Sequence, residues 1–341
     1  RDVSYNTRIA RADFDETASG WHLHTDDGRE MRAQFVVVCT GFGSKPYMPK
    51  IDGLEDFQGE AHHTALWPQD GVELKGKRVG VIGTGASGIQ VAQEAAKVAE
   101  HLTVFQRTPN MFLPMGQQAY SADDNARLRS ELPERFKRRG ETFGGFDFDF
   151  NPKSALEVSE AERTAFYEKL WNAGGFNFWL GIYQDVFTDE VANRTAYDFW
   201  REKIRARIED PKIADMLAPA EPAHPYAVKR PSLEQWYFEI FNYENVSLVS
   251  LKDTPIERVT NTGVIVDGDE IKLDVLAFAT GFDAVTGGLT SIDIHGTSGQ
   301  TIKDKWAKGV RTHLGVATAD FPNMLFSYGP QAPTGFCNGP S

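Results

Sequence analysis

The sequence predicts an α/β protein built on dinucleotide-binding (Rossmann-like) units, and three observations support this prediction. A short apolar strand at 77–82 is followed by a glycine-rich turn and a stretch with helical spacing. Two apolar strands, one early and one late in the chain, end in the same Thr-Gly step. Between them, residues 117–225 are rich in charge and helical periodicity. Alternating strands and helices are typical of a parallel sheet covered by helices.

The first fifty residues predict a β-hairpin whose second strand becomes apolar. Residues 21–25 and 31–38 have strand-like composition and flank the turn Asp26-Asp27-Gly28. The second strand leads into Cys39, Thr40 and Gly41, so we expect an inert core thiol at Cys39 rather than a nucleophile. Two prolines follow shortly, at positions 46 and 49, and exclude a helix after this strand.

The glycine-rich turn predicts a phosphate-binding loop. Gly83, Gly85 and Gly88 have the spacing G-x-G-x-x-G between the strand 77–82 and the helix 86–100. In that setting the first glycine permits the tight turn, the second lets the backbone approach a pyrophosphate, and the third allows close helix packing. A further strand is expected at 101–107. The predicted cofactor-binding residues are Gly83, Thr84, Gly85, Ala86, Ser87 and Gly88.

The end of the strand 101–107 indicates which nucleotide the loop binds. An acidic residue there would accept hydrogen bonds from the ribose of NAD, but this chain has Arg107 and Thr108. A guanidinium can form a bidentate, charge-assisted pair with a 2′-phosphate, so NADP(H) is the predicted dinucleotide. The alternative is that Arg107 is only a solvated arginine at a strand end.

Composition narrows the class of protein. The 341 residues are 41% apolar and 25% charged, which is enough for two or three domains with cores. The net charge of -12 disfavours a nucleic-acid partner, and neither a basic run nor an apolar segment of transmembrane length suggests a membrane. The two cysteines, Cys39 and Cys337, make neither a disulfide framework nor a metal site, so no metal is expected. A cytoplasmic location fits this composition.

A second motif identifies a family. Residues 57–68 have the pattern F-x-G-x-x-x-H-x-x-x-W-P, with His63 and Trp67 at two of its fixed positions. This pattern resembles the fingerprint of Baeyer-Villiger monooxygenases, which belong to the class B flavin-containing monooxygenases. The resemblance implies FAD and NADP(H) as cofactors and two dinucleotide-binding domains, the FAD domain incomplete, with a helical insertion in the NADP domain. The domains implied are 1–50 and 282–341 (FAD), 51–75 (linker with the fingerprint), 76–116 and 226–281 (NADP), and 117–225 (insertion).

The resemblance also implies an activity. NADPH reduces the flavin, O2 adds to give a C4a-peroxide, and its anion inserts one oxygen beside the carbonyl of a ketone, which yields an ester or lactone. Arg230 of the Lys229-Arg230-Pro231 element is the expected catalytic residue, because an always-protonated guanidinium would hold the peroxide as an anion. Lys229 is expected near the NADP 2′-phosphate. His63 is the other catalytic candidate, although a structural hinge role is favoured over proton transfer.

Further cofactor-binding residues follow from the same resemblance. The two Thr-Gly steps, Thr40-Gly41 and Thr280-Gly281, are expected where the chain crosses between the FAD and NADP domains. Trp306 resembles a tryptophan that contacts the nicotinamide nucleotide, and Gln331 lies in a loop resembling one that reaches the flavin. Both could equally be packing or turn residues.

Within the insertion, 159–174 and 188–208 are predicted helices, and 140–150 is predicted to be a loop. Its dense aromatic side chains favour core packing over a substrate box. Beyond it, 232–243 is expected to be helical and 246–251 to be a strand. The core candidates of the insertion are Phe166, Tyr167, Leu170, Trp171, Phe176, Phe178, Trp179 and Tyr183.

One departure from the family limits the prediction. A first G-x-G-x-x-G unit, expected for the FAD pyrophosphate, does not precede Asp2, so an internal fragment is expected. Two other functions stay open beside ketone oxidation. These are an S- or N-oxidising flavin monooxygenase, and a truncated NADP-binding module without activity. The ketone or sulfide, the regioselectivity and the oligomeric state are not determined by the sequence, and neither is FAD binding by this segment alone.

Overall fold

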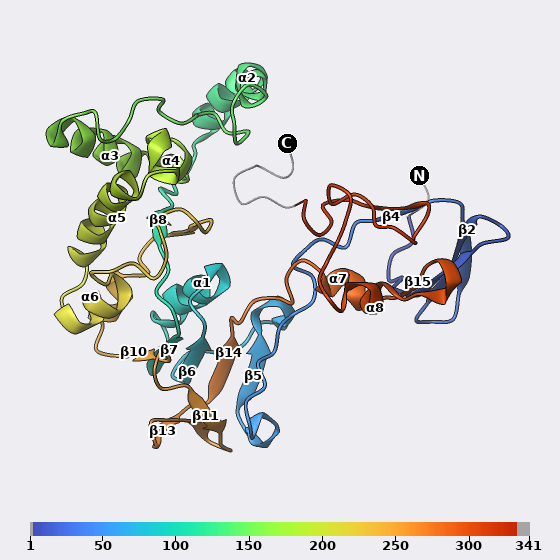
Figure 1. Cartoon of the computed structure of the whole chain (residues 1–341). Coiled ribbons are helices and arrows are strands. Elements are labelled where there is room, and N and C mark those ends of the chain that lie inside the picture. The colour runs from blue at the N-terminus through green and yellow to red at the C-terminus, as the bar shows by residue number, and fades with distance from the viewer. Residues whose placement is uncertain (1–2, 333–341) are drawn as a thin grey trace. The chain divides into compact units, whose positions relative to one another are not determined.

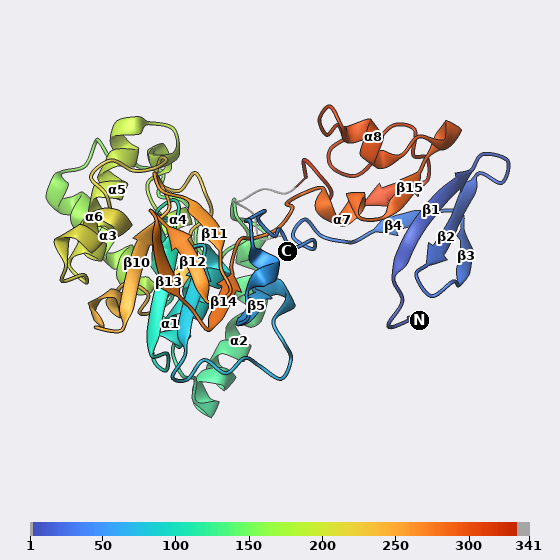
Figure 2. The same ribbon diagram turned by 90° about the horizontal axis from the view of Figure 1, so that it is seen from below.

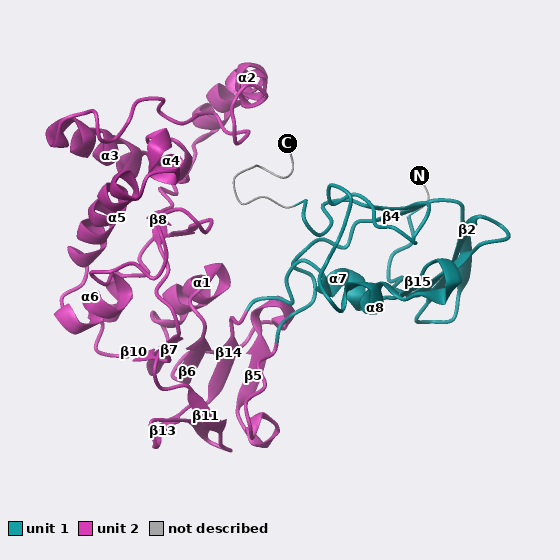
Figure 3. Ribbon diagram, viewed as in Figure 1, with its two compact units in different colours: residues 1–47, 281–334 teal, residues 48–280, 335–341 magenta. Residues whose placement is uncertain are grey.

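The chain folds into two compact units (Figure 3). The computed structural model describes residues 3–332. Unit 1 comprises the described residues 3–47 and 281–332, and unit 2 comprises residues 48–280. Within the described residues, no helix combines the length and the apolar character needed to cross a membrane.

A five-stranded sheet forms the centre of unit 2. Its strand order is β10-β7-β6-β14-β5, and every neighbouring pair is parallel (Figure 1). The chain adds β7 on one side of β6 and β14 on the other, so the strand order reverses at β6. In open α/β sheets, ligands bind beyond the carboxyl ends of the strands at such a reversal. The strands are β5 (Glu60–His63), β6 (Arg78–Ile82), β7 (His101–Gln106), β10 (Val246–Ser250) and β14 (Val275–Phe278).

The predicted strand-loop-helix unit is present. In β6, Val79, Val81 and Ile82 are buried, as expected for a parallel strand covered on both faces. Helix α1 (Ala86–Ala95) follows the glycine loop and buries Ile89. The helix is shorter than the expected 86–100, because the backbone N–H of Glu100 donates to Lys77 O and starts the next strand.

The insertion consists of helices that lie to one side of this sheet (Figures 1 and 2). Serine and aspartate side chains accept hydrogen bonds from first-turn amides at four of their N-termini, which specifies where these helices begin. The predicted helices 159–174 and 188–208 correspond to α3 and α5, and 140–150 is a loop. The helices are α2 (Ala122–Arg139), α3 (Glu160–Ala173), α4 (Asn177–Leu180), α5 (Glu190–Arg205) and α6 (Pro211–Leu217).

The aromatic residues of the insertion form a core, as predicted. Six of the eight candidates are buried, and Phe166 and Phe176 pack against them. The same hydrophobic cluster continues through α1 into β6 and β7, so the insertion and the dinucleotide unit share one core. The six buried candidates are Tyr167, Leu170, Trp171, Phe178, Trp179 and Tyr183.

The expectation for 232–243 is wrong. Residues Ser232–Glu234 form strand β9, which pairs in parallel with β8 (Phe112–Pro114), and only Glu239–Asn242 form a 3-10 turn. The buried carboxylate of Glu234 accepts a hydrogen bond from the backbone N–H of Tyr237. In a helix this N–H would instead donate to a backbone carbonyl of the preceding turn. An antiparallel sheet completes unit 2, with β11 (Ile256–Val259), β12 (Gly263–Val266) and β13 (Asp269–Lys272).

Residues 51–75, expected as a linker, lie within unit 2. They supply the edge strand β5 and two short 3-10 turns, Leu54–Asp56 and Thr64–Leu66. The His63 end of β5 is therefore fixed beside β14, where His63 is the register partner of Phe278.

Unit 1 is a mixed sheet with a small core. β1 pairs with β2 antiparallel and with β15 in parallel, and β3 pairs with β2 across the predicted Asp-Gly turn. Its strands are β1 (Ile9–Asp15), β2 (Gly20–Thr25), β3 (Glu30–Ala33), β15 (Asp293–His295) and the separate pair β4 (Val36–Val38) and β16 (Met324–Phe326). Two short helices, α7 (Gly287–Thr290) and α8 (Ile302–Trp306), contribute Leu289 and Ile302 to the core.

Two expectations for unit 1 are wrong. The strand expected at 31–38 is broken into β3 and β4, which belong to different sheets. Cys39, expected in the core, is exposed, because within residues 3–332 β4 has a partner on one side only and the chain beyond it runs along the surface. Cys337 lies outside the described residues.

Candidate functional site

The glycine loop has the geometry of a phosphate cradle. Gly83 has φ +105°, and a Cβ on it would lie 2.5 Å from the carbonyl oxygen of Ala279. A Cβ on Gly88 would overlap the carbonyl oxygen of Gly83, so both positions require glycine. Gly85, by contrast, has no atom within 4 Å of an added Cβ. The middle glycine therefore faces open space, where the backbone amides at the start of α1 can approach a pyrophosphate.

Three chain segments meet at the carboxyl edge of the parallel sheet. Ile82 and Phe278 are register partners, so the glycine loop and Thr280 leave the sheet side by side. The Thr84 hydroxyl donates to the carbonyl oxygen of Thr108 at 3.3 Å, which ties the loop to the segment after β7. Ala86 and Ser87 form the first turn of α1. The structure thus brings together the predicted residues 83–88, Thr108 and Thr280.

Two exposed cations have no hydrogen-bond or ion-pair partner within residues 3–332. Arg107 follows directly after β7 and is exposed, and it makes no hydrogen bond or ion pair with any described residue. Lys229 is likewise exposed and unpaired within residues 3–332. An unpaired guanidinium at the end of β7 is available to an anionic ligand, as the 2′-phosphate prediction requires.

His63 caps a turn. It is 4% exposed, and its Nδ1 accepts the backbone N–H of Ala65 at 3.1 Å at the start of the 3-10 turn Thr64–Leu66. A ring nitrogen that accepts a backbone proton carries none itself, so the proton of the neutral imidazole is on Nε2. This geometry supports the structural role of His63 over catalytic proton transfer.

Arg230 lies against two aromatic rings. Its guanidinium carbon is 5.1 Å from the ring centroid of Phe176 and 5.8 Å from that of Trp179, and both rings belong to the insertion at α4. Arg230 is exposed, and no carboxylate of the described residues pairs with it. The two rings thus define the position on the surface of unit 2 at which the guanidinium presents its permanent positive charge.

The segment preceding Arg230 is fixed to the insertion. The buried Tyr226 hydroxyl donates to Phe178 O at 2.9 Å, and the indole N–H of Trp179 donates to Ala227 O at 3.3 Å. Asn193 bonds both the N–H and the carbonyl oxygen of Tyr226. Burial raises the pKa of the Tyr226 hydroxyl well above its usual value, so the hydroxyl remains a donor. These contacts hold Ala227 at φ +66°, a conformation that non-glycine residues rarely adopt.

The segment following Arg230 is fixed to α1. Arg207 forms ion pairs with the fully buried Glu234 at 2.7 Å and with Glu239 at 2.6 Å. Burial opposes charge on Arg207, but its hydrogen bonds to the two carboxylates raise its pKa above the usual value. The buried Gln93 of α1 accepts the backbone N–H groups of Gln235 and Trp236. One helix therefore carries the glycine loop at its start and holds the Arg230 segment near its end.

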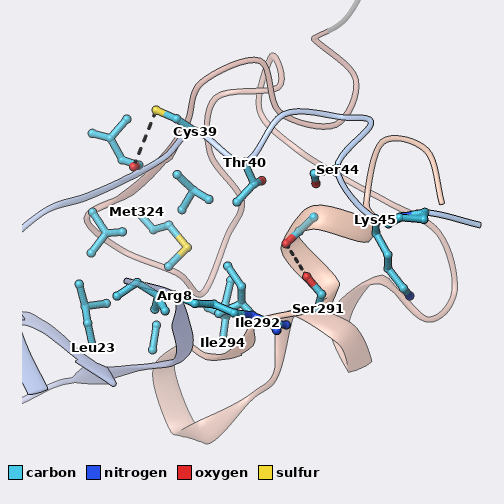
Figure 4. A pocket seen from close by; sticks show the side chains of 17 residues that line it. Arg8, Leu23, Cys39, Thr40, Ser44, Lys45, Ser291, Ile292, Ile294 and Met324 are labelled. Carbon is cyan, nitrogen blue, oxygen red and sulfur yellow. Dashed lines mark hydrogen bonds between the residues drawn. The ribbon is translucent and has the colours of Figure 1, made fainter. Parts of the chain in front are cut away.

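Unit 1 contains a cavity of about 630 Å³ beside Thr40 (Figure 4). Its walls are mainly apolar, and their polar side chains include Arg8, Thr40, Ser44, Lys45 and Ser291. Gly41 has φ +71° and no atom within 4 Å of an added Cβ. The Lys45 ammonium pairs with Asp283 at 2.9 Å.

The two late candidates have packing partners in unit 1. Trp306 is 7% exposed and packs against Phe326, and it lines a cavity of about 570 Å³ with Lys305, Lys308 and Arg311. The Gln331 side-chain oxygen accepts the backbone N–H of Thr312 at 2.9 Å. Gln331 thus closes a turn, which supports the alternative prediction that it is a turn residue.

The residues fit the two cofactors to different extents. For NADP(H), the groups needed to bind the cofactor are present: the loop with its required glycines, the helix α1 that follows it, and Arg107. For FAD, unit 1 offers a cavity beside Thr40. Its described helices α7 and α8 are only 4 and 5 residues long, and neither is preceded by the spacing G-x-G-x-x-G, so the described part of unit 1 forms no pyrophosphate cradle.

Sequence reasoning missed the residues that support this site. Gln93, Asn193 and Arg207 hold the segment around Arg230 from outside it, and Glu234 within that segment is the partner of Arg207. Gln93 gave one usable signal, since it is a polar residue beside the apolar stripe of α1. Within residues 3–332 no group of three metal-ligating side chains is found.

Comparison with known proteins agrees with these observations. A sequence profile of the flavin-binding monooxygenase-like family matches residues 4–124. A cyclopentanone 1,2-monooxygenase from Comamonas sp. (strain NCIMB 9872) is 57% identical over all 341 residues, which is 100% of this chain and 62% of that protein. Solved structures are also similar, and two serve as examples. The OTEMO complex with FAD and NADP has a TM-score of 0.93 at 38% identity, covering 97% of this chain and 63% of its own. An open cyclohexanone monooxygenase has a TM-score of 0.88 at 39% identity, covering 95% and 63%.

The chain thus spans slightly less than two thirds of the proteins that it matches. The match to the Comamonas relative runs from one end of this chain to the other and includes the fingerprint, the glycine loop and the Lys229-Arg230-Pro231 element. The similar structures share the fold of the described residues. The chain therefore resembles the flavin-binding monooxygenase-like proteins along its whole length, and it resembles the Baeyer-Villiger monooxygenases among them.

Proposed function

We propose that this chain supplies the NADPH site and the catalytic arginine of an FAD-dependent monooxygenase that converts a ketone into an ester or lactone with O2. One observation carries the proposal. The fingerprint strand β5 and the glycine loop after β6 lie on either side of β14 in one sheet, with their carboxyl ends at the same edge. The fingerprint and the dinucleotide site are therefore parts of one structure.

NADPH is held by three groups in this proposal. The N–H groups at the start of α1 bind the pyrophosphate beside Gly85. Arg107 and Lys229 bind the 2′-phosphate, since both are exposed cations that pair with no other described residue. Removing a charge-assisted bond of this kind costs roughly 1.5 to 3 kcal/mol, which is about tenfold to a hundredfold in affinity.

Arg107→Ala tests the nucleotide assignment. We expect it to weaken NADPH binding by about tenfold to a hundredfold while NADH binding changes little, because NADH has no 2′-phosphate. Isothermal titration of both nucleotides measures this difference. Equal losses for the two would refute the role of Arg107.

Arg230 supplies a fixed positive charge for the oxygen-transfer step. When bound, FAD accepts the hydride and activates O2. A guanidinium stays protonated at any working pH, so it stabilises negative charge on the reacting oxygen atoms without exchanging a proton. In this proposal His63 keeps the end of β5 in place and transfers no proton.

The substrate is a small ketone in this proposal, and cyclopentanone is the first to test because the 57% identical relative is named for it. The purified chain is incubated with FAD, NADPH is added under nitrogen, and air and ketone follow. We expect retained flavin absorption that bleaches with NADPH, and lactone by mass spectrometry. Arg230→Ala should retain NADPH binding and lose the lactone.

Two outcomes contradict the proposal. Lactone formed at the normal rate by the Arg230→Ala protein would refute the role of the arginine. A protein that oxidises methyl phenyl sulfide but none of a series of cyclic and linear ketones would be a heteroatom monooxygenase. NADPH binding without retained flavin would assign the chain to the third possibility, an NADP-binding module that is inactive by itself.

A further inference from the structure

The aromatic pair that contacts Arg230 is the strongest unassigned feature of the molecule. Phe176 and Trp179 form a T-shaped pair with ring centroids 5.5 Å apart, and the guanidinium lies within 6 Å of both centroids. This is the range in which a cation is attracted to the face of an aromatic ring. With no carboxylate of residues 3–332 to pair with, Arg230 is placed by these rings.

The two rings are fixed more firmly than the arginine. Trp179 is 1% exposed, and its indole N–H donates to Ala227 O, three residues before Arg230. Phe176 packs edge-on against Phe146 at 5.9 Å. The rings therefore belong to the shared core of unit 2, whereas the Arg230 side chain lies on its surface. Because the rigid rings restrict the Arg230 side chain before any ligand binds, this side chain loses less conformational entropy when a ligand does bind.

The neighbouring cation shows that this placement is specific. Lys229 is adjacent in the sequence and also exposed, but it contacts no aromatic ring among the described residues. Any effect of the rings on charge position should therefore act on Arg230 and spare Lys229.

We propose that Phe176 and Trp179 are positioning residues for Arg230, so that the helical insertion sets where the catalytic charge is presented. This inference rests on the proposed function for its catalytic consequence. Its structural part, the coupling between ring and guanidinium, can be measured without any cofactor.

A double-mutant cycle on the unfolding equilibrium tests the coupling. Phe176→Leu removes the ring from a partly buried position and keeps an apolar side chain there. It is combined with Arg230→Ala and, as the matched control, with Lys229→Ala. We expect the Phe176–Arg230 pair to be coupled by about two- to fivefold in the unfolding constant, and the Phe176–Lys229 pair by a factor close to one. Equal factors for both pairs would overturn the proposal.

Steady-state kinetics of the FAD-loaded protein test the consequence. Phe176→Leu should lower kcat for ketone oxidation about tenfold and leave the KM for NADPH within twofold, and Phe176→Tyr, which restores a ring, should recover most of kcat. A variant that merely packs badly would lose folded protein and would not change kcat per bound flavin. An unchanged kcat in Phe176→Leu would overturn the catalytic part of the proposal.

The two tests separate the possible failures. If the unaltered chain oxidises no ketone, the proposed function fails, and the cycle still decides whether the rings place Arg230. If Trp179→Phe, which keeps a ring, folds and yet abolishes the Phe176–Arg230 coupling, ring contact is not the cause and the inference is wrong.

Discussion

The strands β4 and β14 have similar sequences and opposite environments. Val36–Val38 leads into Cys39-Thr40-Gly41, and Val275–Phe278 leads into Ala279-Thr280-Gly281. Every residue of β14 is buried, whereas Val37 of β4 is 59% exposed. β14 lies between two strands of a five-stranded sheet, whereas β16 is the one strand of the described chain that pairs with β4.

The difference shows that neighbours, rather than sequence, determine how a strand is buried. An apolar run of three or four residues is compatible with the centre of a parallel sheet and with an exposed pair. The two glycines that follow are nonetheless alike, with φ +71° at Gly41 and +82° at Gly281. The two segments therefore share the left-handed conformation of the glycine, but they differ in how their strands are packed.

The largest expected effect is that of a charge placed in each strand. Leu276→Asp puts a carboxylate at a fully buried position and should destabilise unit 2 by about 4 kcal/mol or more. Val37→Asp, at an exposed position of β4, should cost below about 1 kcal/mol. Urea unfolding followed by circular dichroism compares the two midpoints. Similar shifts would mean that β4 is covered in solution and that the contrast between the strands is wrong.

Alanine at the two glycines should have an intermediate effect. Neither Gly41 nor Gly281 has an atom within 4 Å of an added Cβ, so only the left-handed backbone opposes the substitution. We expect each of Gly41→Ala and Gly281→Ala to cost about 1 to 2 kcal/mol, and the same amount within error. Thermal unfolding of both variants measures this. A much larger loss in one would show that its turn has a packing role the other lacks.

The smallest expected effect concerns the start of β14. Hydrogen bonds from Arg78 lower the pKa of the Asp274 carboxyl to about 2. Because the folded-state pKa lies below the unfolded one, the pair stabilises the protein above about pH 4, and this contribution is lost as the pH falls towards 2. Asp274 is one third exposed, so the contribution is about 1 kcal/mol.

Acid titration of unfolding stability checks this pair. Asp274→Asn should be less stable at pH 7 by about 1 kcal/mol and should show a shallower loss between pH 4 and 2. A variant whose acid limb matches that of the unaltered protein would contradict the assignment. Among the described residues, no ion pair of this kind lies at the start of β4. The pH dependence of the stability of unit 1, which contains β4, therefore serves as the internal reference.

The features that local chemistry fixes could be predicted from the sequence. Gly88 is required by a contact within the loop and Gly83 by its own positive φ, and β6, α1 and β7 follow from their apolar spacing. The aromatic core of the insertion was equally clear, because residues such as Tyr167 and Phe178 have few alternatives to burial.

The features that distant partners fix could not be predicted. The exposure of Cys39 depends on β4 having a single neighbour, and the strand at 232–234 forms because Phe112–Pro114 is available to pair with it. The contact of Arg230 with Phe176 joins residues far apart in sequence through a segment held by Asn193. No periodicity in the sequence records such a contact.

The two segments that follow the Thr-Gly steps are bonded to each other. Tyr47 N–H donates to Gly281 O at 2.9 Å, Asp283 N–H donates to Lys45 O at 2.8 Å, and Lys45 pairs with Asp283. The chain thus leaves unit 1 at 47 and returns at 281 through adjacent points. Unit 2 has the topology of a guest inserted into a host at one site, with its own ends already together. Closing such ends adds little entropic penalty, so residues 48–280 are suited to transfer between related hosts as a single exchangeable module.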